Sequence, residues 1–224
     1  IEPLQMPKIC LAGRIPPQNA ILALEDNRCT SKHKMWPDFH NGVAAGLRLP
    51  LAKEGGKRLT RTWIVCNRPK PPPPPPPAQA SQLPPTPDPD HTYGGFLFAL
   101  GLRGHLSALD KTDIVDYINK GPVTTAVGMM LGLAANKRGS CDVTIFKTLC
   151  VHIPSLLPSS FRSIDLSSSV QTAAVAGVGL LCQGSSHRLL TEFLLNEIGK
   201  RPTVDQNTDD REGYHLCCGI SLGM

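Results

Sequence analysis

Two kinds of apolar segment alternate along the C-terminal part of the chain. The first kind is apolar on nearly all sides and rich in small residues, as in "PVTTAVGMMLGLAAN" at 122–136. The second kind is amphipathic: one helix face in 187–199 carries Leu190, Leu194, Leu195 and Ile198, with polar residues mostly opposite. A helix that is apolar all round is buried, whereas an amphipathic one covers a core. The alternation therefore predicts inner helices near 93–103, 122–136, 169–183 and 210–224, with amphipathic helices at 111–119, 141–153 and 187–199 between them.

The ends of these segments carry helix signals. Pro122 suits the first helical position and Gly139 follows the end of the same segment. Ser168 stands three residues before Gln171, the spacing of a capping box, and Gly184 follows as a stop. These signals place the helix boundaries within a few residues.

Glycines recur inside the segments that are apolar all round. A glycine in a helix interior costs about 1 kcal/mol relative to alanine, so its repeated use there needs a compensating contact. Residues four apart lie on one helix face, and small side chains on that face let two helix backbones approach closely. We therefore predict a small-residue seam between helices, against the alternative of a compact helical domain with coincidental glycines; the seam comprises Gly42, Gly46, Gly101, Gly128, Gly132, Gly177, Gly179, Gly219 and Gly223.

The spacing of the seam glycines predicts a repeat. Gly101, Gly132, Gly179 and Gly223 are separated by 31, 47 and 44 residues, and the two longer intervals contain polar loops. A basic unit of about 35–40 residues is the length of a helix–turn–helix repeat. The predicted fold class is an all-α solenoid of helical hairpins.

The chain divides into four parts by composition. Residues 1–35 are turn-rich and predicted to be irregular, and 36–67 contain a small-residue helix at Phe39–Leu49 followed by a short β-branched segment, Arg61–Asn67, predicted to be extended. Residues 68–92 form a proline-rich linker or insertion, expected to be polyproline II or disordered. Residues 93–224 hold the helical repeats, which the pattern indicates are truncated at the C-terminus.

The proline run Pro71–Pro77 raises the possibility of a partner. A preformed polyproline helix is the ligand of SH3 and WW domains, so such a contact is one alternative. A spacer is the commoner role of such a segment.

The charge and hydropathy of the chain argue against two classes of partner. The net charge is +5, and the excess lies in the single stretch 53–70, where Trp63 is the only aromatic residue. A nucleic-acid footprint spreads basic residues over a face, so we expect no nucleic-acid binding. No uncharged apolar run reaches the 18 residues that indicate a membrane span, so we expect no membrane insertion.

Eight cysteines invite a test for metal or thiol chemistry. Four of them lie in apolar stretches where cysteine behaves as a small hydrophobic residue, which favours free thiols in a reducing compartment. The possible zinc groups lack the C-x2-C pairs of structural sites; they are Cys141 with Cys150 and His152, Cys182 with His187, and His215 with Cys217 and Cys218.

The segment "CQGSSH" brings a thiol, a hydroxyl and an imidazole together in sequence at 182–187. Catalytic Cys–His pairs meet in space rather than in sequence, so we predict neither catalytic residues nor a cofactor. A thiol or zinc enzyme remains the alternative of a different class.

Several motifs together resemble a known family. "HNGVAAGL", "GGFLFALGLRGHL", "VGMMLGLAANKRG", "VQTAAVAGVGLLCQGSSHR" and "TDDREGYHLCCGISLGM" resemble the proteasome/cyclosome repeats. "WPDFHNGVAAGLRL", "TWIVCNRPK", "CVHIPSLLP" and "HRLLTEFLLNEIGKRP" are more similar to the scaffold subunits of the anaphase-promoting complex, a cell-cycle ubiquitin ligase, than to proteasomal members. The resemblance covers most of 36–224. Two features depart from it: the run Pro71–Pro77 falls where a short link is expected, and Cys217–Cys218 occupy a usually alanine-like position.

The resemblance implies hairpin repeats that curve toward a closed ring and a non-catalytic scaffold role in mitosis and cell division. It implies partners among the other subunits of the anaphase-promoting complex and its coactivators, and a location in nucleus and cytoplasm. It assigns no partner-contact residue. The alternative within the same repeat family is a scaffold of the proteasome regulatory-particle base.

Overall fold

The fold was examined in a computed structural model, which describes residues 12–15, 17–18, 20–23, 31–52, 59–69, 90–158, 166–200 and 211–224. Apart from one short hairpin, the regular elements in these ranges are helices, which confirms the predicted all-α class. They are α1 (Ser31–Gly46), α2 (Arg61–Cys66), α3 (Thr92–Leu102), α4 (Lys111–Lys120), α5 (Val123–Asn136), α6 (Val143–Cys150), α7 (Ser168–Leu181), α8 (Arg188–Gly199) and α9 (Arg211–Leu222), with short 3₁₀ turns η3 (Leu106–Ala108) and η4 (Pro154–Leu156).

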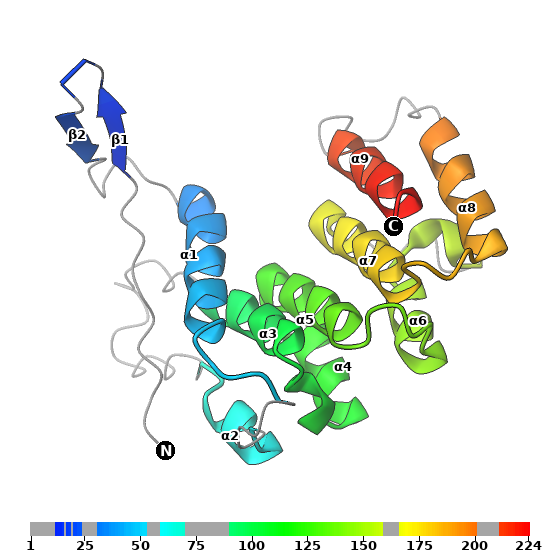
Figure 1. Cartoon of the computed structure of the whole chain (residues 1–224), viewed down its shortest axis with the longest axis horizontal. Coiled ribbons are helices and arrows are strands. Elements are labelled where there is room, and N and C mark those ends of the chain that lie inside the picture. The colour runs from blue at the N-terminus through cyan, green and yellow to red at the C-terminus, as the bar shows by residue number, and fades with distance from the viewer. Residues whose placement is uncertain are drawn as a thin grey trace, which may run out of the picture.

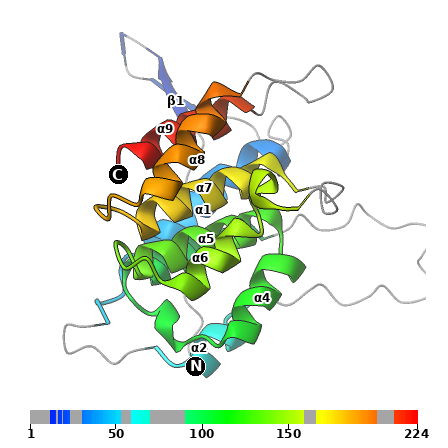
Figure 2. The same ribbon diagram turned by 90° about the vertical axis from the view of Figure 1, so that its right-hand side faces the viewer.

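The odd-numbered long helices form one row. In order along the row, α1 contacts α3, α3 contacts α5, α5 contacts α7 and α7 contacts α9. The even-numbered helices α4, α6 and α8 pack on α5, α7 and α9 respectively, outside the row (Figures 1 and 2). The alternation of segment types in the sequence therefore corresponds to inner and outer helices of a hairpin solenoid.

Burial explains which helix takes which place. In α5, ten of the fourteen residues are buried, as expected for a helix covered on all sides. The amphipathic helix α4 buries only Tyr117 and Ile118. The inner helices supply most of the hydrophobic core, which is continuous from Ile64 on α2 to Cys218 on α9.

Segment 61–67 was predicted to be extended, and that prediction is wrong. Arg61–Cys66 form helix α2, whose first turn is capped by Thr60: its Oγ1 accepts a hydrogen bond from the backbone N–H of Trp63 at 3.2 Å. Ile64 is fully buried and Trp63 packs on Phe96, with ring centroids 6.0 Å apart. Tertiary packing therefore overrides the weak strand preference of the β-branched residues.

The N-terminal part also differs from the prediction of an irregular segment over 1–35. Strand β1 (Ala12–Ile15) pairs antiparallel with β2 (Ala20–Ala23), with Ala12 opposite Ala23 and Ile15 opposite Ala20. Helix α1 begins at Ser31, well before the predicted Phe39, and includes Pro37. Phe39 anchors this helix, because its ring stacks on Phe98 of α3 at 6.4 Å.

Some predicted features lie outside the described residues. They include Pro71–Pro77 with most of the proline-rich segment, residues 53–58 and Lys70 of the basic stretch, and Cys10 and Cys29. Among the helices that the structure describes, none combines the length and the apolar character needed to cross a membrane.

Candidate functional site

The contact between α3 and α5 is made by glycine against backbone. A Cβ built on Gly101 would overlap the backbone of Gly132, and one built on Gly128 would overlap the carbonyl of Gly94. At Gly132 an added Cβ would lie 2.8 Å from Leu106 Cδ1 and 2.9 Å from the Leu97 carbonyl oxygen. Real Cβ atoms do not make such contacts, so these positions admit only glycine at the present helix separation.

The contact between α1 and α3 follows the same rule. A Cβ at Gly42 would overlap the Thr92 carbonyl, and one at Gly46 would lie 2.5 Å from Ala99 Cβ. From the opposite side, Gly95 lies against the carbonyl of Phe39. Glycines from both helices therefore set the close approach.

The two glycines of α7 contact different neighbouring helices. A Cβ at Gly179 would lie 2.6 Å from Ser221 Cβ on α9, the next inner helix. A Cβ at Gly177 would lie 3.1 Å from Leu149 Cδ1, a side chain of the outer helix α6. Gly177 thus faces an outer helix and a flexible side chain, so its contact is the looser of the two.

The contact between α7 and α9 does not use the glycines of α9. Gly219 has no neighbouring atom within 4 Å of a built Cβ, and Gly223 meets only carbonyl oxygens of its own turn. Helix α9 instead faces α7 with Cys217 and Ser221, whose Sγ and Oγ donate hydrogen bonds to the carbonyls of Thr172 at 3.5 Å and Val175 at 3.2 Å. Among the described residues Gly219 and Gly223 therefore meet no neighbouring helix, and their part in a seam stays a prediction.

Sequence reasoning also missed Gly94 and Gly95 at the start of α3. Gly94 precedes Gly101 by seven residues, two helical turns, so both lie on nearly one face. That heptad spacing was the available signal. Because a double glycine is also typical of a turn, the sequence alone does not identify Gly94 and Gly95 as helix-contact residues.

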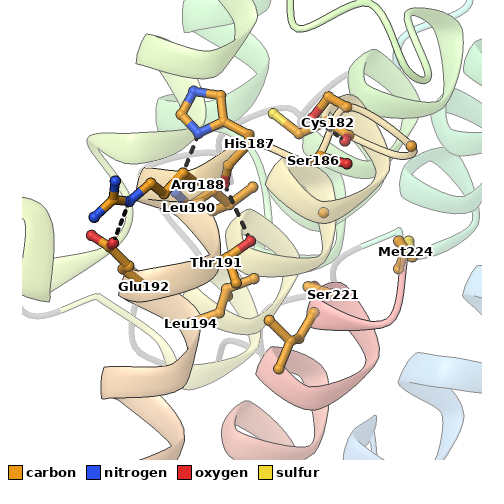
Figure 3. Close-up of a pocket in the computed structure, with 14 residues that line it drawn as sticks. Cys182, Ser186, His187, Arg188, Leu190, Thr191, Glu192, Leu194, Ser221 and Met224 are labelled. Carbon is orange, nitrogen blue, oxygen red and sulfur yellow. Dashed lines mark hydrogen bonds and ion pairs between the residues drawn. The ribbon is translucent and has the colours of Figure 1, made fainter.

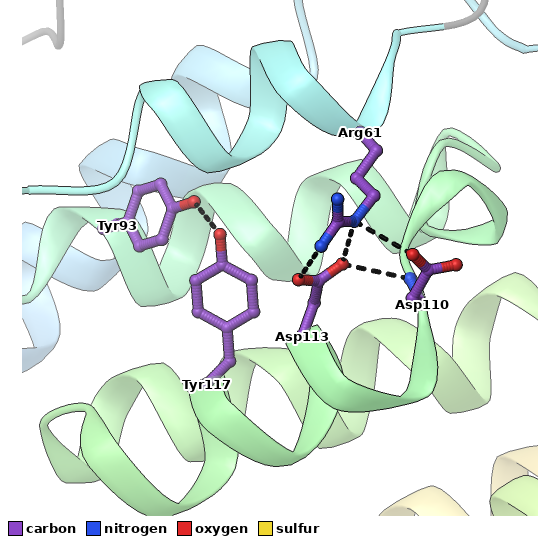
Figure 4. A network of polar contacts seen from close by, with 5 residues as sticks. All are labelled: Arg61, Tyr93, Asp110, Asp113 and Tyr117. Atoms are coloured by element: carbon purple, nitrogen blue, oxygen red, sulfur yellow. Dashed lines mark hydrogen bonds and ion pairs between the residues drawn. The ribbon is translucent and has the colours of Figure 1, made fainter.

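A polar network joins α2 to the repeats (Figure 4). Arg61 donates two hydrogen bonds to Asp113 on α4, Nε to Oδ2 at 2.6 Å and Nη2 to Oδ1 at 2.8 Å, and also pairs with Asp110 at 3.1 Å. The bond from Arg61 lowers the pKa of the Asp113 carboxyl below its usual value. These charges are at the surface, so they orient α2 more than they stabilise it.

Beside this ion pair, two tyrosines connect α2, α3 and α4 (Figure 4). Tyr93 Oη donates to the carbonyl of Ile64 at 3.0 Å and lies 3.0 Å from Tyr117 Oη. Burial, followed by the Tyr117 hydrogen bond, raises the pKa of Tyr93 far above its usual value, so both phenols stay neutral. The pair satisfies polar atoms that the packing of α2 removes from water.

A buried carboxylate ties α8 to α9. Glu197 is 1% exposed, and its Oε2 accepts hydrogen bonds from Tyr214 Oη at 3.0 Å and Ser155 Oγ at 2.8 Å. Lys200 pairs with the other carboxylate oxygen of Glu197 and donates to Ser155 Oγ at 3.1 Å. A buried charge with this many partners holds one arrangement of outer and inner helix.

A cavity of about 590 Å³ lies where α7, α8 and α9 meet, and it includes Cys182, Ser185 and His187 (Figure 3). His187 Nδ1 accepts the N–H of Leu190 at 3.2 Å as the cap of α8, and Ser185 Oγ donates to the Cys182 carbonyl at 2.6 Å. Burial raises the pKa of the Cys182 thiol to about 12. The imidazole and hydroxyl are thus engaged in helix termini and the thiol is protonated, which is the opposite of an activated nucleophile.

The candidate zinc residues do not assemble a site. Within the described ranges, no group of three or more His, Cys, Asp and Glu side chains could hold a metal ion. His152 Nδ1 contacts the Thr148 carbonyl at 2.9 Å instead. Burial raises the pKa of the Cys150 thiol to about 11 and also raises the pKa values of Cys217 and Cys218.

The outer helices and α9 present apolar side chains to solvent. Leu189 on α8 is 71% exposed, and further exposed apolar residues lie on or beside α6, η4, α8 and α9. The exposed apolar residues in this part of the chain are Val143, Val151, Leu156, Leu189, Leu195, Ile198, Leu216 and Ile220.

Comparison with known proteins gives two consecutive matches to family profiles. Residues 1–138 match the family described as "APC1 fourth domain", and residues 143–224 match the one described as "APC1 fifth domain". The break between them falls in the turn between α5 and α6, although α5 and α7 pack against each other across it.

Relatives from distant eukaryotes align along the whole chain. "Anaphase-promoting complex subunit 1" of Homo sapiens is 41% identical over 226 aligned positions, which cover 100% of this chain. The protein of the same name from Arabidopsis thaliana is 41% identical over 98% of the chain, and "Negative regulator of mitosis" from Emericella nidulans is 31% identical over 100%. The chain spans only 11%, 12% and 10% of the lengths of these three proteins.

Proposed function

Since this chain belongs to the anaphase-promoting complex subunit 1 family, we propose that it is a segment of a non-catalytic scaffold in that cell-cycle ubiquitin ligase. Its role is to hold the other subunits and the coactivators in fixed relative positions while ubiquitin transfer takes place on other subunits. We further propose that the protein is found in the nucleus and the cytoplasm, because its proposed role is in mitosis.

One observation carries this proposal: the inner helices meet backbone to backbone. Gly101 against Gly132 and Gly128 against Gly94 leave no side-chain layer that could slide or repack. Close-packed interiors transmit displacement rather than absorb it. A partner bound to one outer helix is therefore held in a defined position relative to a partner bound to the next.

The outer faces supply surface for such partners. Leu189 and Leu195 on α8 and Val143 on α6 are exposed by 71%, 54% and 64%. Contiguous apolar patches are common at protein-binding surfaces, and we infer that these side chains contribute to such patches. The charged side chains among them, such as Lys147, add polar contacts at the rim of such a surface.

Affinity capture of the tagged full-length protein tests the assignment. We expect the other subunits of the anaphase-promoting complex to be recovered. Recovery of proteasomal ATPases in their place would favour the proteasome-base alternative and overturn the proposal.

Three variants distinguish a scaffold role from a catalytic role. Gly101→Leu with Gly132→Leu forces α3 and α5 apart, so we expect several partners to be lost together. Gly199→Ala, at an exposed position of α8 where an added methyl meets no atom within 4 Å among the described residues, should keep them. Cys182→Ser should leave ubiquitin transfer by the assembled complex unchanged. Loss of transfer in a fully assembled Cys182→Ser complex would contradict the non-catalytic role.

A further inference from the structure

Two cysteines from different repeats meet at the turns that end α5 and α7. Cys141 follows the turn after α5, and its backbone N–H donates to the Leu181 carbonyl at 3.0 Å. Two residues earlier, the N–H of Gly139 donates to the Leu180 carbonyl at 3.1 Å. Cys182 directly follows Leu181, so these two hydrogen bonds bring its backbone beside that of Cys141.

The side chains complete the approach. The Cys141 thiol is one of the groups that raise the pKa of Cys182, after burial, so the two side chains are neighbours, and both residues are free cysteines. Cys141 has a positive φ of 51°, unusual for a residue with a side chain, so the turn holds it in a conformation that Gly or Asn would adopt more readily. A disulfide requires Cα atoms about 4.4–6.8 Å apart, and the backbone hydrogen bond between Cys141 and the residue before Cys182 brings the two cysteines into one neighbourhood.

Access differs between the two residues. Cys141 is half-buried, whereas Cys182 is 6% exposed and lies at the cavity between α7, α8 and α9. A small oxidant from solvent therefore reaches Cys141 first. Cys182 is protected from outside but is in place to react with an oxidised Cys141.

We propose that Cys141 and Cys182 are an oxidisable dithiol, a modification site for hydrogen peroxide or a comparable small oxidant, whose disulfide joins two adjacent repeats. In the first step Cys141 Sγ attacks one peroxide oxygen, the O–O bond breaks, and Cys141 sulfenic acid and one water are formed. In the second, Cys182 Sγ attacks the adjacent Cys141 sulfur, because proximity compensates for its small thiolate fraction. The S–O bond breaks, and the displaced hydroxide takes the thiol proton and leaves as a second water. The sum is two thiols and one peroxide giving one disulfide and two waters.

The disulfide would close a loop from 141 to 182 that contains α6 and α7. Closing a loop of this length restricts the unfolded chain, and the bond also fixes the turn of one hairpin to the turn of the next. Oxidation therefore makes the repeat stack stiffer without changing its arrangement. Disulfides in a reducing compartment are generally transient and regulatory, which suits a site that reductants can restore.

Peptide mapping of the full-length subunit in its purified complex tests the proposal. The complex is treated with hydrogen peroxide, remaining thiols are blocked with N-ethylmaleimide, and trypsin digests are compared with and without reductant. Cleavage after Arg138, Lys147, Arg162 and Arg188 puts Cys141, Cys150 and Cys182 in three different peptides. We expect peptides 139–147 and 163–188 to be linked after oxidation and separate after reduction.

Three variants sharpen the result. Cys141→Ser and Cys182→Ser should abolish the link, whereas Cys150→Ser, a matched control from the neighbouring helix α6, should preserve it. Linkage of 163–188 to the Cys150 peptide, or no linkage at peroxide levels that oxidise exposed Cys66, would overturn the proposal. Mapping of the wild-type complex decides the question even where a variant folds poorly.

Discussion

Gly101 of α3 lies so close to Gly132 of α5 that a single methyl group on Gly101 would overlap the neighbouring backbone. The relation recurs at Gly128 with Gly94 and at Gly42 with Thr92, so it is a property of the inner row. Glycine has a lower helix propensity than alanine, and the close packing between helices at each such contact offsets this cost in free energy. Because the outer helices pack on the inner row, the row also sets their positions.

The buried carboxylate of Glu197 should matter far more than an exposed one on the same helix. Tyr214→Phe removes one donor to Glu197, and we expect a loss of about 1–2 kcal/mol in the free energy of unfolding. Glu197→Ala leaves the Tyr214 hydroxyl buried without its acceptor, so the expected loss is larger, about 3 kcal/mol. Urea unfolding measures both.

The matched control for this network is Glu192→Ala. Glu192 pairs with Arg188 at 2.7 Å on the same helix α8 but is exposed, so its loss should change stability by about 0.5 kcal/mol or less. Equal effects at Glu192 and Glu197 would show that the buried network is not what holds α8 to α9.

The ion pair of Arg61 and Asp113 should make the attachment of α2 depend on pH. The pKa of Asp113 is lowered in the folded state, so its contribution is fully present above the unfolded-state pKa of about 3.9 and is lost as pH falls through the lower folded-state value. Arg61→Gln should therefore be less stable than wild type at pH 7, and the difference should vanish near pH 2. Paired thermal scans over this range test it; a difference that persists at the acidic end would contradict the ion-pair explanation.

The thiol of Cys182 should be slow to react with alkylating agents. Burial raises its pKa to about 12, so almost no thiolate exists at pH 8. In a time course with iodoacetamide, exposed Cys66 should be labelled first and Cys182 last. Labelling of Cys182 ahead of Cys66 would instead indicate an activated nucleophile in the cavity.

The sequence predicted the fold class and the inner helices because their signals are local. All-round apolar character in 122–136 and the Gly at 139 are properties of neighbouring residues, and α5 ends within a residue or two of the prediction. The amphipathic face of 187–199 likewise predicted the outer helix α8.

Features that depend on distant contacts could not be predicted in this way. Helix α2 exists because Ile64 and Trp63 pack on α3 residues some 30 positions away, which no local preference encodes. The open face of Gly219 was indistinguishable from the packed face of Gly128, since both have a glycine four residues away. The network at Glu197 joins 155, 197 and 214, and its members have no common sequence spacing.

Unfolding of the chain carrying Gly101→Ala, beside Gly219→Ala, tests the backbone-to-backbone packing most directly. The substitutions are chemically identical and both lie inside helices, but one added methyl meets the backbone of Gly132 and the other meets no atom within 4 Å. We predict that Gly101→Ala lowers the free energy of unfolding by about 2 kcal/mol or more, whereas Gly219→Ala raises it by up to about 1 kcal/mol. Equal stabilisation by both substitutions would contradict the packing of the inner row described above.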